Sequence, residues 1–314
     1  MTDYSKYIWH NSEIIPWENA KVHVMSHVIH YGSGVFEGIK CYKTDKGPQI
    51  FRLEDHVDRL FKSAESYKMN VPVSKQSIID GCLEIVRANN LTECYIRPIV
   101  FYGYDTLGVN PKDCPINVSI AAFFWGAYLG EDGVLNGVNV TVSPYQKFSS
   151  KAMPATAKAS GQYMNSLLSV TDAKARGYDE ALLLNVEGNV SEGSGQNIFY
   201  IKDGVVHTNS EKSSILLGIT RESIIEICND LDIQIEIHSF TLEDLLCADE
   251  VFFTGTASEV TPVISIEDNI ISGGKPGELT LKLRSYYMDI VEGRNDKYNK
   301  WLSPIISDSV IENS

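Results

Sequence analysis

Two stretches with helical periodicity followed by two strand-like stretches constrain the fold of this chain most. Residues 53–69 and 73–89 carry apolar side chains every three to four positions with charged residues between them, which predicts two amphipathic helices. Ser74 is a suitable cap for the second helix. Residues 93–101 and 117–125 are rich in β-branched and aromatic side chains and predict strands. This alternation indicates a fold of the α/β class with mixed α+β character.

A glycine-rich acidic stretch divides the chain. Residues 130–137 hold three glycines among acidic and amide side chains, so we expect an interdomain linker at 130–136. It would separate a smaller N-terminal α/β domain (1–129) from a larger C-terminal domain (137–314). In the second domain we expect strands at 138–142, 180–184, 196–201, 205–208, 233–237 and 250–254, and helices at 220–231 and 277–292. A turn at Asp203-Gly204 would join two of these strands into a hairpin.

The charge balance disfavours binding to nucleic acid or to anionic membranes. The chain of 314 residues has 27 Lys and Arg against 41 Asp and Glu, a formal net charge of −14, and no dense basic run. The first residues lack the layout of a signal peptide, and the longest apolar stretch, 118–129, is shorter than the ~20 residues that cross a bilayer. These features, and six dispersed cysteines expected to be reduced thiols, predict a cytoplasmic protein.

Several familiar motifs are absent or misleading. The sequence contains no phosphate-binding loop, no H-E-x-x-H and no G-x-S-x-G. Gly32, Gly34 and Gly38 are spaced one residue too far apart for the dinucleotide-binding fingerprint. Three histidines, His23, His27 and His30, would share one face and could form a metal site only if they lay on a helix. Their valine-rich surroundings favour a strand or turn, and we expect ordinary hydrogen-bonded histidines there and no metal.

Four short segments combine a reactive residue with small neighbours. Lys158 lies among alanines, serine and glycine, where partial burial would free its amine, although a surface lysine has the same pattern. Glu192 lies beside glycine, which suits either a flat ligand or an exposed turn. Residues 217–221 open a helix and offer an anion site or a simple cap at Thr220. Residues 254–259 are rich in hydroxyls. An amine, a carboxylate and two anion sites together match pyridoxal phosphate (PLP).

These segments and several further motifs follow one another along the chain in the order found in the branched-chain amino-acid aminotransferases. The sequence therefore resembles this family of fold-type IV PLP enzymes. The resemblance runs from Tyr7 to about Glu292 and includes His30-Tyr31-Gly32-Ser33-Gly34-Val35-Phe36-Glu37-Gly38-Ile39-Lys40, Tyr95-Ile96-Arg97-Pro98 and Leu107-Gly108-Val109-Asn110-Pro111. It implies a two-domain fold like that of D-amino-acid aminotransferase. It also implies reversible amino transfer between L-leucine, L-isoleucine or L-valine and 2-oxoglutarate, by way of pyridoxamine phosphate.

The resemblance implies a role for each matching position that binds the cofactor. Lys158 would be the catalytic lysine, which forms a Schiff base with PLP and then moves a proton. Glu192 would face the pyridine nitrogen, Tyr163 would bind the ring's phenolic oxygen and Arg59 would pair with the phosphate. The phosphate cup would be completed by Leu217, Gly218, Ile219, Thr220 and Thr256.

Substrate recognition is implied in the first domain and in the 255–257 loop. Backbone N–H groups of the loop residues Gly255, Thr256 and Ala257 would hold the α-carboxylate. The side-chain pocket would be formed by Tyr31, Phe36, Gly38, Tyr95, Val109 and Tyr128. Arg97 would hold the γ-carboxylate of L-glutamate, the amino donor. An apolar pocket distinguishes one methylene by only ~1–3 kcal/mol, so it would accept all three branched substrates and their 2-oxo acids.

The same resemblance implies at least a homodimer, with the 107–109 loop completing the site of the partner. Two departures stand out, Gln162 where relatives more often carry asparagine and Gln196 where many carry glutamate, and neither carries a predicted role. The alternatives are a D-amino-acid aminotransferase or an aminodeoxychorismate lyase on the same fold, or a binding protein without PLP. Arg97 and the 255–259 loop favour the branched-chain pattern over the first two. Retention of Lys158 and Glu192 disfavours the last.

Overall fold

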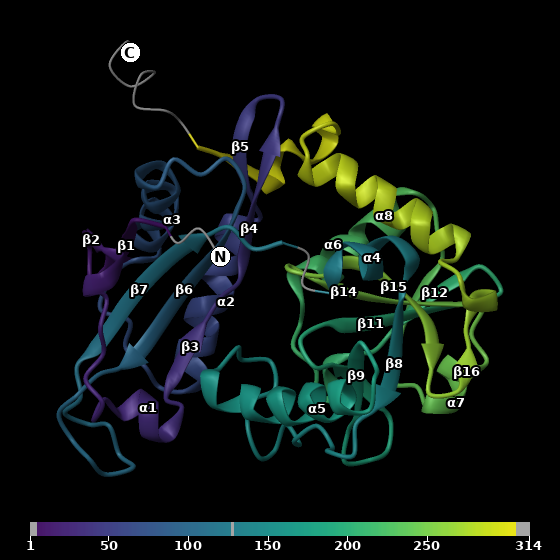
Figure 1. Ribbon diagram of the computed structural model, residues 1–314, viewed down its shortest axis with the longest axis horizontal. Coiled ribbons are helices and arrows are strands. Elements are labelled where there is room, and N and C mark those ends of the chain that lie inside the picture. Colours follow the sequence, from purple (N-terminus) through teal and green to yellow (C-terminus); the bar gives the residue numbers. More distant parts are fainter. Residues whose placement is uncertain (1–4, 127–128, 306–314) are drawn as a thin grey trace. The chain divides into compact units, whose positions relative to one another are not determined.

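The computed structural model describes residues 5–126 and 129–305, without the side chains of 131, 132 and 134 (Figure 1). Contacts divide the chain into two compact units. The first unit comprises the described residues of Met1–Trp125, Ala157–Gly161 and Asp289–Ser314. The second comprises those of Gly126–Thr156 and Gln162–Met288. No helix within the described ranges is long and apolar enough to cross a membrane.

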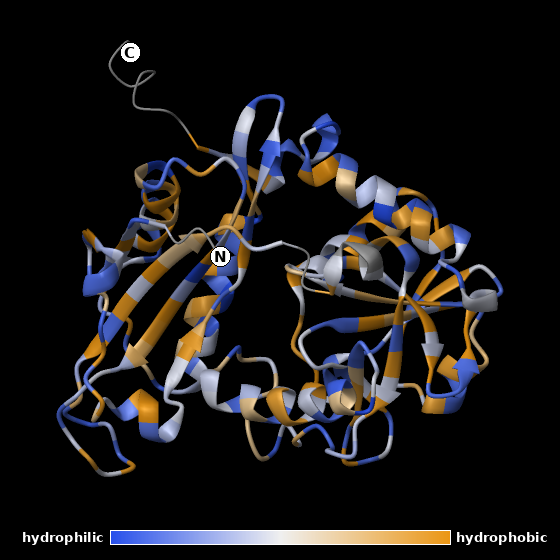
Figure 2. Cartoon of the chain, in the orientation of Figure 1, coloured by the Kyte–Doolittle hydropathy of each residue, from blue (hydrophilic) through white to orange (hydrophobic). Residues whose placement is uncertain are grey.

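The first unit is built on an eight-stranded sheet in which every pair of strands is antiparallel. Its order is β17-β5-β4-β6-β7-β1-β2, and β3 pairs with β6. The strands are β1 (Tyr7–His10), β2 (Glu13–Pro16), β3 (Gly34–Phe36), β4 (Ile39–Thr44), β5 (Gly47–Phe51), β6 (Cys94–Tyr102), β7 (Ile116–Phe123) and β17 (Leu302–Pro304). Hydrophobic and hydrophilic bands alternate along β6 and β7 in Figure 2, as expected of strands with two different faces.

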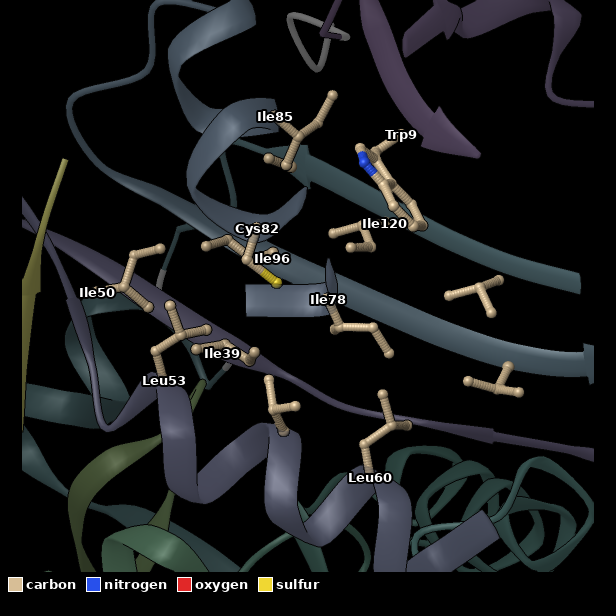
Figure 3. Packing of buried hydrophobic residues seen from close by; sticks show 14 of the residues in the cluster. Trp9, Ile39, Ile50, Leu53, Leu60, Ile78, Cys82, Ile85, Ile96 and Ile120 are labelled. Carbon is tan, nitrogen blue, oxygen red and sulfur yellow. The ribbon is translucent and has the colours of Figure 1, made fainter. Parts of the chain in front are cut away.

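Helices α2 (Leu53–Ser66) and α3 (Lys75–Ala88) pack on this sheet, and α1 (His27–Tyr31) is a short helix before β3. Figure 3 shows the side chains between the helices and the sheet. The labelled side chains that are completely buried are Ile39, Ile50, Leu60, Ile78, Cys82, Ile85, Ile96 and Ile120. Burial of each leucine or isoleucine contributes about 1.5–3 kcal/mol, so this core holds the sheet and both helices together. Ser74 caps α3 by accepting a hydrogen bond from the Ser77 N–H, as predicted.

The second unit is built on a nine-stranded mixed sheet. Its order is β10-β9-β8-β15-β14-β11-β12-β13, and β16 pairs with β15. The strands are β8 (Val138–Val142), β9 (Glu180–Leu184), β10 (Val190–Gly193), β11 (Asn197–Lys202), β12 (Val205–Thr208), β13 (Ile235–Ile237), β14 (Glu250–Gly255), β15 (Glu259–Ile266) and β16 (Asn269–Ile270). The pairs β8–β9, β8–β15 and β12–β13 are parallel. The predicted hairpin turn is present, with positive φ at both Asp203 and Gly204.

The helices of the second unit surround this sheet. They are α4 (Gly130–Asn136), α5 (Tyr163–Ala175), α6 (Ile219–Asp230), α7 (Leu242–Leu246) and α8 (Glu278–Val291), whose last residues belong to the first unit. Helix α5 packs on β8 and β9, and α6 packs on β13 and β14. Short 3-10 segments occur at Trp17–Asn19, Ser160–Gln162, Glu211–Ser213, Ser272–Gly274 and Asp296–Trp301.

The predicted mixed α/β class and the long helices are confirmed, but three expectations differ from the structure. Residues 130–136, expected as a linker, form α4, with glycines of positive φ at each end of the helical stretch. The expected C-terminal domain at 137–314 includes Lys158, whereas Ala157–Gly161 packs into the first unit. Thr220 does not cap its helix, because the cap position of α6 is Gly218.

The three N-terminal histidines form hydrogen bonds with the chain, as predicted. His23 accepts from the Met25 N–H at 3.1 Å, and His27 contacts the Ser33 hydroxyl at 2.7 Å. His30 contacts the Val24 carbonyl at 3.1 Å. His23 lies just before a turn, whereas His27 and His30 lie on the short helix α1, where a strand or turn was expected.

Candidate functional site

Lys158 is held by its backbone in the first unit. Its N–H donates to the Ser63 hydroxyl of α2 at 2.9 Å, and its carbonyl accepts from the Phe36 N–H at 3.0 Å. The next residue, Ala159, pairs with Val35 of β3. These contacts on both sides fix the backbone of Lys158 and Ala159 and therefore the position of the lysine Cα atom. The small residues that surround Lys158 in the sequence allow this close packing.

The amine of Lys158 is in an environment that favours its uncharged form. Its Nζ atom lies 5.0 Å from the centre of the Phe36 ring. Loss of water contact, and then the positive charge of Arg59, lower the pKa of Lys158 from 10.5 to about 8, although Glu37 opposes this effect. A lysine with a pKa near 8 has an available lone pair in an appreciable fraction of molecules at neutral pH, as a nucleophilic amine requires.

Arg59, the predicted phosphate ligand, is oriented by a buried carboxylate. The Arg59 Nε and Nη2 atoms donate to the two Glu37 oxygens at 2.7 and 2.8 Å. His56 Nδ1 lies 2.7 Å from Glu37 Oε2. Burial alone would raise the pKa of Glu37, but the charge of Arg59 and the hydrogen bonds from His56 and Arg59 outweigh it and hold that pKa far below its usual range.

The same cluster fixes the protonation of His56. Burial lowers the pKa of His56, and the nearby charges of Arg59 and Lys158 add to the effect, while Glu37 opposes it. Because ionised Glu37 only accepts hydrogen bonds, neutral His56 carries its proton on Nδ1. The guanidinium of Arg59 is therefore held by a carboxylate that is itself held by a neutral imidazole.

Arg97 lies among aromatic rings in the same unit. Its guanidinium carbon is 5.0 Å from the Phe36 ring centre, 5.2 Å from that of Tyr95 and 5.9 Å from that of Trp125. Its buried Nε atom has no hydrogen-bond partner among the residues described. Gly38 lies against this group, since a Cβ added there would lie 1.7 Å from the Tyr95 hydroxyl. An arginine held by rings and not by an acid keeps its charge available for pairing with an anion.

Two of the predicted pocket residues have contacts elsewhere in the first unit. The Tyr31 hydroxyl donates to the Leu107 carbonyl at 2.9 Å. His27 Nε2 lies 3.0 Å from the Gly108 carbonyl and 3.2 Å from that of Val109. The loop 107–109 is thus fastened to α1, and the Val109 side chain is 77% exposed. Tyr128, also predicted to line the pocket, lies outside the described residues.

Glu192 is held by three groups of the second unit. Its Oε1 atom accepts from Lys147 Nζ at 2.6 Å, and both side chains are at most 10% exposed. Its Oε2 atom accepts from Asn197 Nδ2 at 3.2 Å and from the Leu216 N–H at 3.0 Å. The exposed turn considered for Glu192 is therefore wrong, because the carboxylate is buried, paired and oriented.

Asn197 connects Glu192 to the predicted phosphate cup. Its Nδ2 atom also donates to the Leu216 carbonyl at 2.8 Å, and a Cβ added to Gly218 would lie 2.0 Å from its Oδ1 atom. Asn197 pairs with Thr254 across β11 and β14. The start of α6, the end of β14 and Glu192 thus meet around one amide side chain.

The anion-binding groups expected in the second unit are present at these element ends. Leu217, Gly218, Ile219 and Thr220 lead into α6, a helix of 12 residues whose first N–H groups lack partners within the helix. Gly255, Thr256 and Ala257 turn the chain from β14 into β15. Beside them, the buried hydroxyls of Thr254 and Ser258 have no hydrogen-bond partner among the residues described. Unpartnered donors next to a helix start suit a phosphate.

Tyr163 begins α5 and is half-buried.

The two departures from the family pattern, Gln162 and Gln196, form hydrogen bonds within the second unit. Gln162 donates to the Pro154 carbonyl at 3.0 Å, and Gln196 donates to Glu180 at 2.8 Å. These contacts lie within the second unit and leave the predicted roles unaffected.

Four residues of the site were missed in the sequence: Glu37, His56, Lys147 and Asn197. Glu37 and Asn197 lie within motifs that carry the family resemblance, but nothing in a sequence shows that a glutamate is fully buried. His56 and Arg59 are three positions apart on an amphipathic helix, which places them on one face and was an available signal. Lys147 had no local signal, because it is 45 residues from Glu192.

We expect the lowered pKa of Lys158 to be measurable directly. In the apoprotein with lysines labelled by reductive ¹³C-methylation, one resonance should titrate near pH 8, well below the ordinary value for a lysine. That resonance should be missing from Lys158→Ala. Because the unfolded chain keeps this proton up to higher pH, the stability of the apoprotein relative to Lys158→Ala should rise as the pH increases from about 8 to 10.5. Titration of every lysine near 10 would contradict the assignment.

Lys147→Met should destabilise the apoprotein by about 3 kcal/mol, because it leaves the Glu192 carboxylate buried without its cation. Lys147→Arg should retain most of the stability. The double variant Lys147→Met/Glu192→Gln should recover part of the loss, since no unpaired charge remains. Urea unfolding measures all three. A double variant no more stable than Lys147→Met would show that the pair does not interact as described.

Comparisons with known proteins agree with this arrangement. A sequence model of the family described as amino-transferase class IV matches residues 34–266. The branched-chain-amino-acid aminotransferase of Salmonella typhimurium is 43% identical over 307 residues, which covers 98% of this chain and 99% of that protein. The protein of the same name from Pseudomonas aeruginosa is 41% identical and covers 96% and 98% of the two chains.

Solved structures give the same result. The crystal structure of the Escherichia coli branched-chain amino acid aminotransferase matches with a TM-score of 0.94 at 42% identity, covering 96% of this chain and 100% of that one. The branched-chain amino acid aminotransferase from Thermobaculum terrenum, solved in its PLP-form, matches with a TM-score of 0.90 at 33% identity, covering 97% and 99%. With the lysine, the carboxylate and the element ends described above, these matches show that the chain belongs to the class IV aminotransferases, among the branched-chain-amino-acid aminotransferases.

Proposed function

We propose that this chain transfers an amino group reversibly between L-leucine, L-isoleucine or L-valine and 2-oxoglutarate, with PLP as cofactor. The observation that carries the proposal is Lys158, a fixed lysine whose pKa is lowered to about 8. The residues fit PLP. A carboxylate is available for a pyridine nitrogen, and unpartnered buried hydroxyls and a bare glycine backbone are available for a phosphate. PLP supplies an electron-withdrawing ring that stabilises negative charge on the substrate's Cα.

The chain's own residues position the groups and move the proton. Nζ of Lys158 would take the proton from the substrate's Cα and deliver it to the cofactor carbon that receives the amino group, a task suited to a base with a pKa near neutrality. Glu192, held by Lys147 and Asn197, presents its carboxylate in one orientation to a cationic ring nitrogen. Arg59, oriented by Glu37, would neutralise charge on the phosphate, and the start of α6 with Thr220 and Thr256 would donate hydrogen bonds to it. Tyr163 binds the phenolic oxygen.

Arg97 allows one pocket to accept two kinds of side chain. Its guanidinium has no acidic partner among the described residues, and Phe36 and Tyr95 surround it with apolar surface. A branched aliphatic side chain packs on those rings, while the γ-carboxylate of glutamate pairs with the guanidinium. The turn at Gly255, Thr256 and Ala257 supplies backbone N–H groups for the α-carboxylate.

We also propose that two copies of the chain associate. Five large apolar side chains, Val22, Val24, Ile29, Leu107 and Val109, are exposed on α1, the turn before it and the loop fastened to it. Exposed apolar groups gathered in one region mark an interaction surface. In a symmetric pair, Tyr31 and Val109 would complete the pocket of the other copy. The free cysteines, five of them buried, are consistent with a reducing compartment such as the cytoplasm.

The activity is tested by the visible absorption of the PLP-loaded protein. L-Leucine and L-glutamate, added to separate samples, should each convert the yellow form to the colourless amine form, and 2-oxoglutarate should restore the colour. D-leucine should have no effect. Lys158→Ala, which lacks the base, should show no turnover. A response to D-leucine alone would keep the fold and overturn the substrate assignment, and a protein that takes up no PLP would overturn the function.

Arg97→Leu should separate the two substrates. Loss of a charged hydrogen-bond partner costs about 1.5–3 kcal/mol, so kcat/KM for L-glutamate should fall roughly 10- to 100-fold. The value for L-leucine should change by less than about threefold, since the rings remain. Lys43→Leu, which removes an exposed cation from β4, is the matched control and should change neither. An equal loss for both substrates would assign Arg97 to general packing.

A further inference from the structure

Three possible metal ligands meet at the edge of the sheet in the second unit, a place the proposed function does not use. His207 lies on β12 and is in register with Glu236 on the parallel strand β13. His238 follows β13, where its N–H donates to the Thr208 carbonyl at 3.1 Å. Since alternate residues of a strand share a face, Glu236 and His238 point to the same side of the sheet as His207.

The spacing of the ligand atoms matches a single ion. His207 Nδ1 lies 3.1 Å from His238 Nε2 and 3.6 Å from Glu236 Oε2, and one such atom from each residue lies within 4.8 Å of the others. Two nitrogens bound to one tetrahedral zinc at 2.0–2.1 Å are roughly 3.3 Å apart. The observed separations lie on either side of this value, so a small side-chain rotation brings the atoms to bonding distance.

Each of the three side chains is oriented by a further contact. The His238 Nδ1 atom lies 3.0 Å from the Ser239 carbonyl and donates to it, which leaves a lone pair on Nε2 facing His207. Glu236 Oε1 accepts from Gln234 Nε2 at 3.2 Å, so Oε2 remains toward His207. The His207 ring stacks on Tyr200 at 4.4 Å with an interplanar angle of 11°. Such outer contacts fix ligand orientation in known metal sites.

We propose that His207 Nδ1, His238 Nε2 and a Glu236 oxygen bind one divalent transition-metal ion, preferably zinc, with water in the fourth position. Imidazole and carboxylate ligands suit zinc and its neighbours better than magnesium or calcium. Without metal, the His207 Nδ1 proton bridges to His238; binding moves this proton to His207 Nε2, and a bond from Nδ1 to the ion replaces the hydrogen bond between the two rings. The ion would join β13, a strand of three residues, to β12 and thereby stabilise this sheet edge.

The test uses the tag-free PLP-loaded enzyme, stripped of metal with a chelator and titrated with zinc chloride in a calorimeter. We expect saturable binding of one zinc per chain. His207→Gln and His238→Gln should each weaken binding by at least about 100-fold, and Gln234→Ala by about tenfold. His23→Gln, which removes an exposed histidine of the first unit, should leave binding unchanged.

A third variant and cobalt(II) spectroscopy test the site further. Glu236→Gln changes a half-exposed side chain with no core contact, so it should fold normally and still weaken binding. Cobalt(II) should give the absorption bands of a tetrahedral complex, which zinc should abolish. Absence of saturable binding, or binding that His207→Gln, His238→Gln and Glu236→Gln leave unchanged, would overturn the proposal. Because transamination does not involve these residues, a failure here leaves the proposed function intact, and the reverse also holds.

Discussion

The backbone hydrogen bonds around Lys158 are the constraint on which the proposed chemistry depends. The segment Ala157–Gly161 belongs to the first unit, whereas the chain before and after it belongs to the second. Its bonds to Ser63 and Phe36 place the lysine beside Arg59 and Glu37 of the same unit. The pKa of the amine is therefore set by neighbours that share one packed core with it, and a shift of this segment would change both the position and the charge of the base.

Each unit contains one buried carboxylate that is compensated by a cation and then used to orient a functional group. In the first unit Glu37 pairs with Arg59, and in the second Glu192 pairs with Lys147. The roles are reversed: Glu37 orients its cation toward a ligand, whereas Lys147 orients its carboxylate. A buried pair of this kind adds little net stability, because desolvation costs as much as the attraction returns. Its benefit is a single direction for the group that meets the cofactor.

Much of the fold could be predicted because its signals are local. The two amphipathic helices, the Ser74 cap and the Asp203-Gly204 turn depend on residues a few positions apart. The prediction of a linker at 130–136 differs from the structure because glycine occurs both in flexible segments and at positions of positive φ next to helices. Gly130 and Gly137 have positive φ and bound a seven-residue helix, a role that the sequence does not distinguish from flexibility.

The site was predictable only in part for the same reason. Lys158, Glu192 and Arg97 were found through motifs, yet their partners depend on register between distant elements: Glu37 is 22 residues from Arg59, and Lys147 is 45 from Glu192. The packing of Ala157–Gly161 into the first unit is also a long-range event. The sequence was thus sufficient to identify the residues that carry the proposed chemistry. The residues that orient them and shift their pKa values could be identified only from the structure.

In the proposed function, Arg97 meets two opposing demands of transamination with one side chain. An acidic partner would neutralise the guanidinium and leave no attraction for the γ-carboxylate of glutamate. A bare, solvated guanidinium would make the pocket too polar for leucine. Phe36, Tyr95 and Trp125 solve both problems, because their faces attract the cation by about 0.5–2 kcal/mol without cancelling its charge, and their edges remain apolar. The proposed dual specificity would therefore depend on the rings that hold the arginine as much as on the arginine itself.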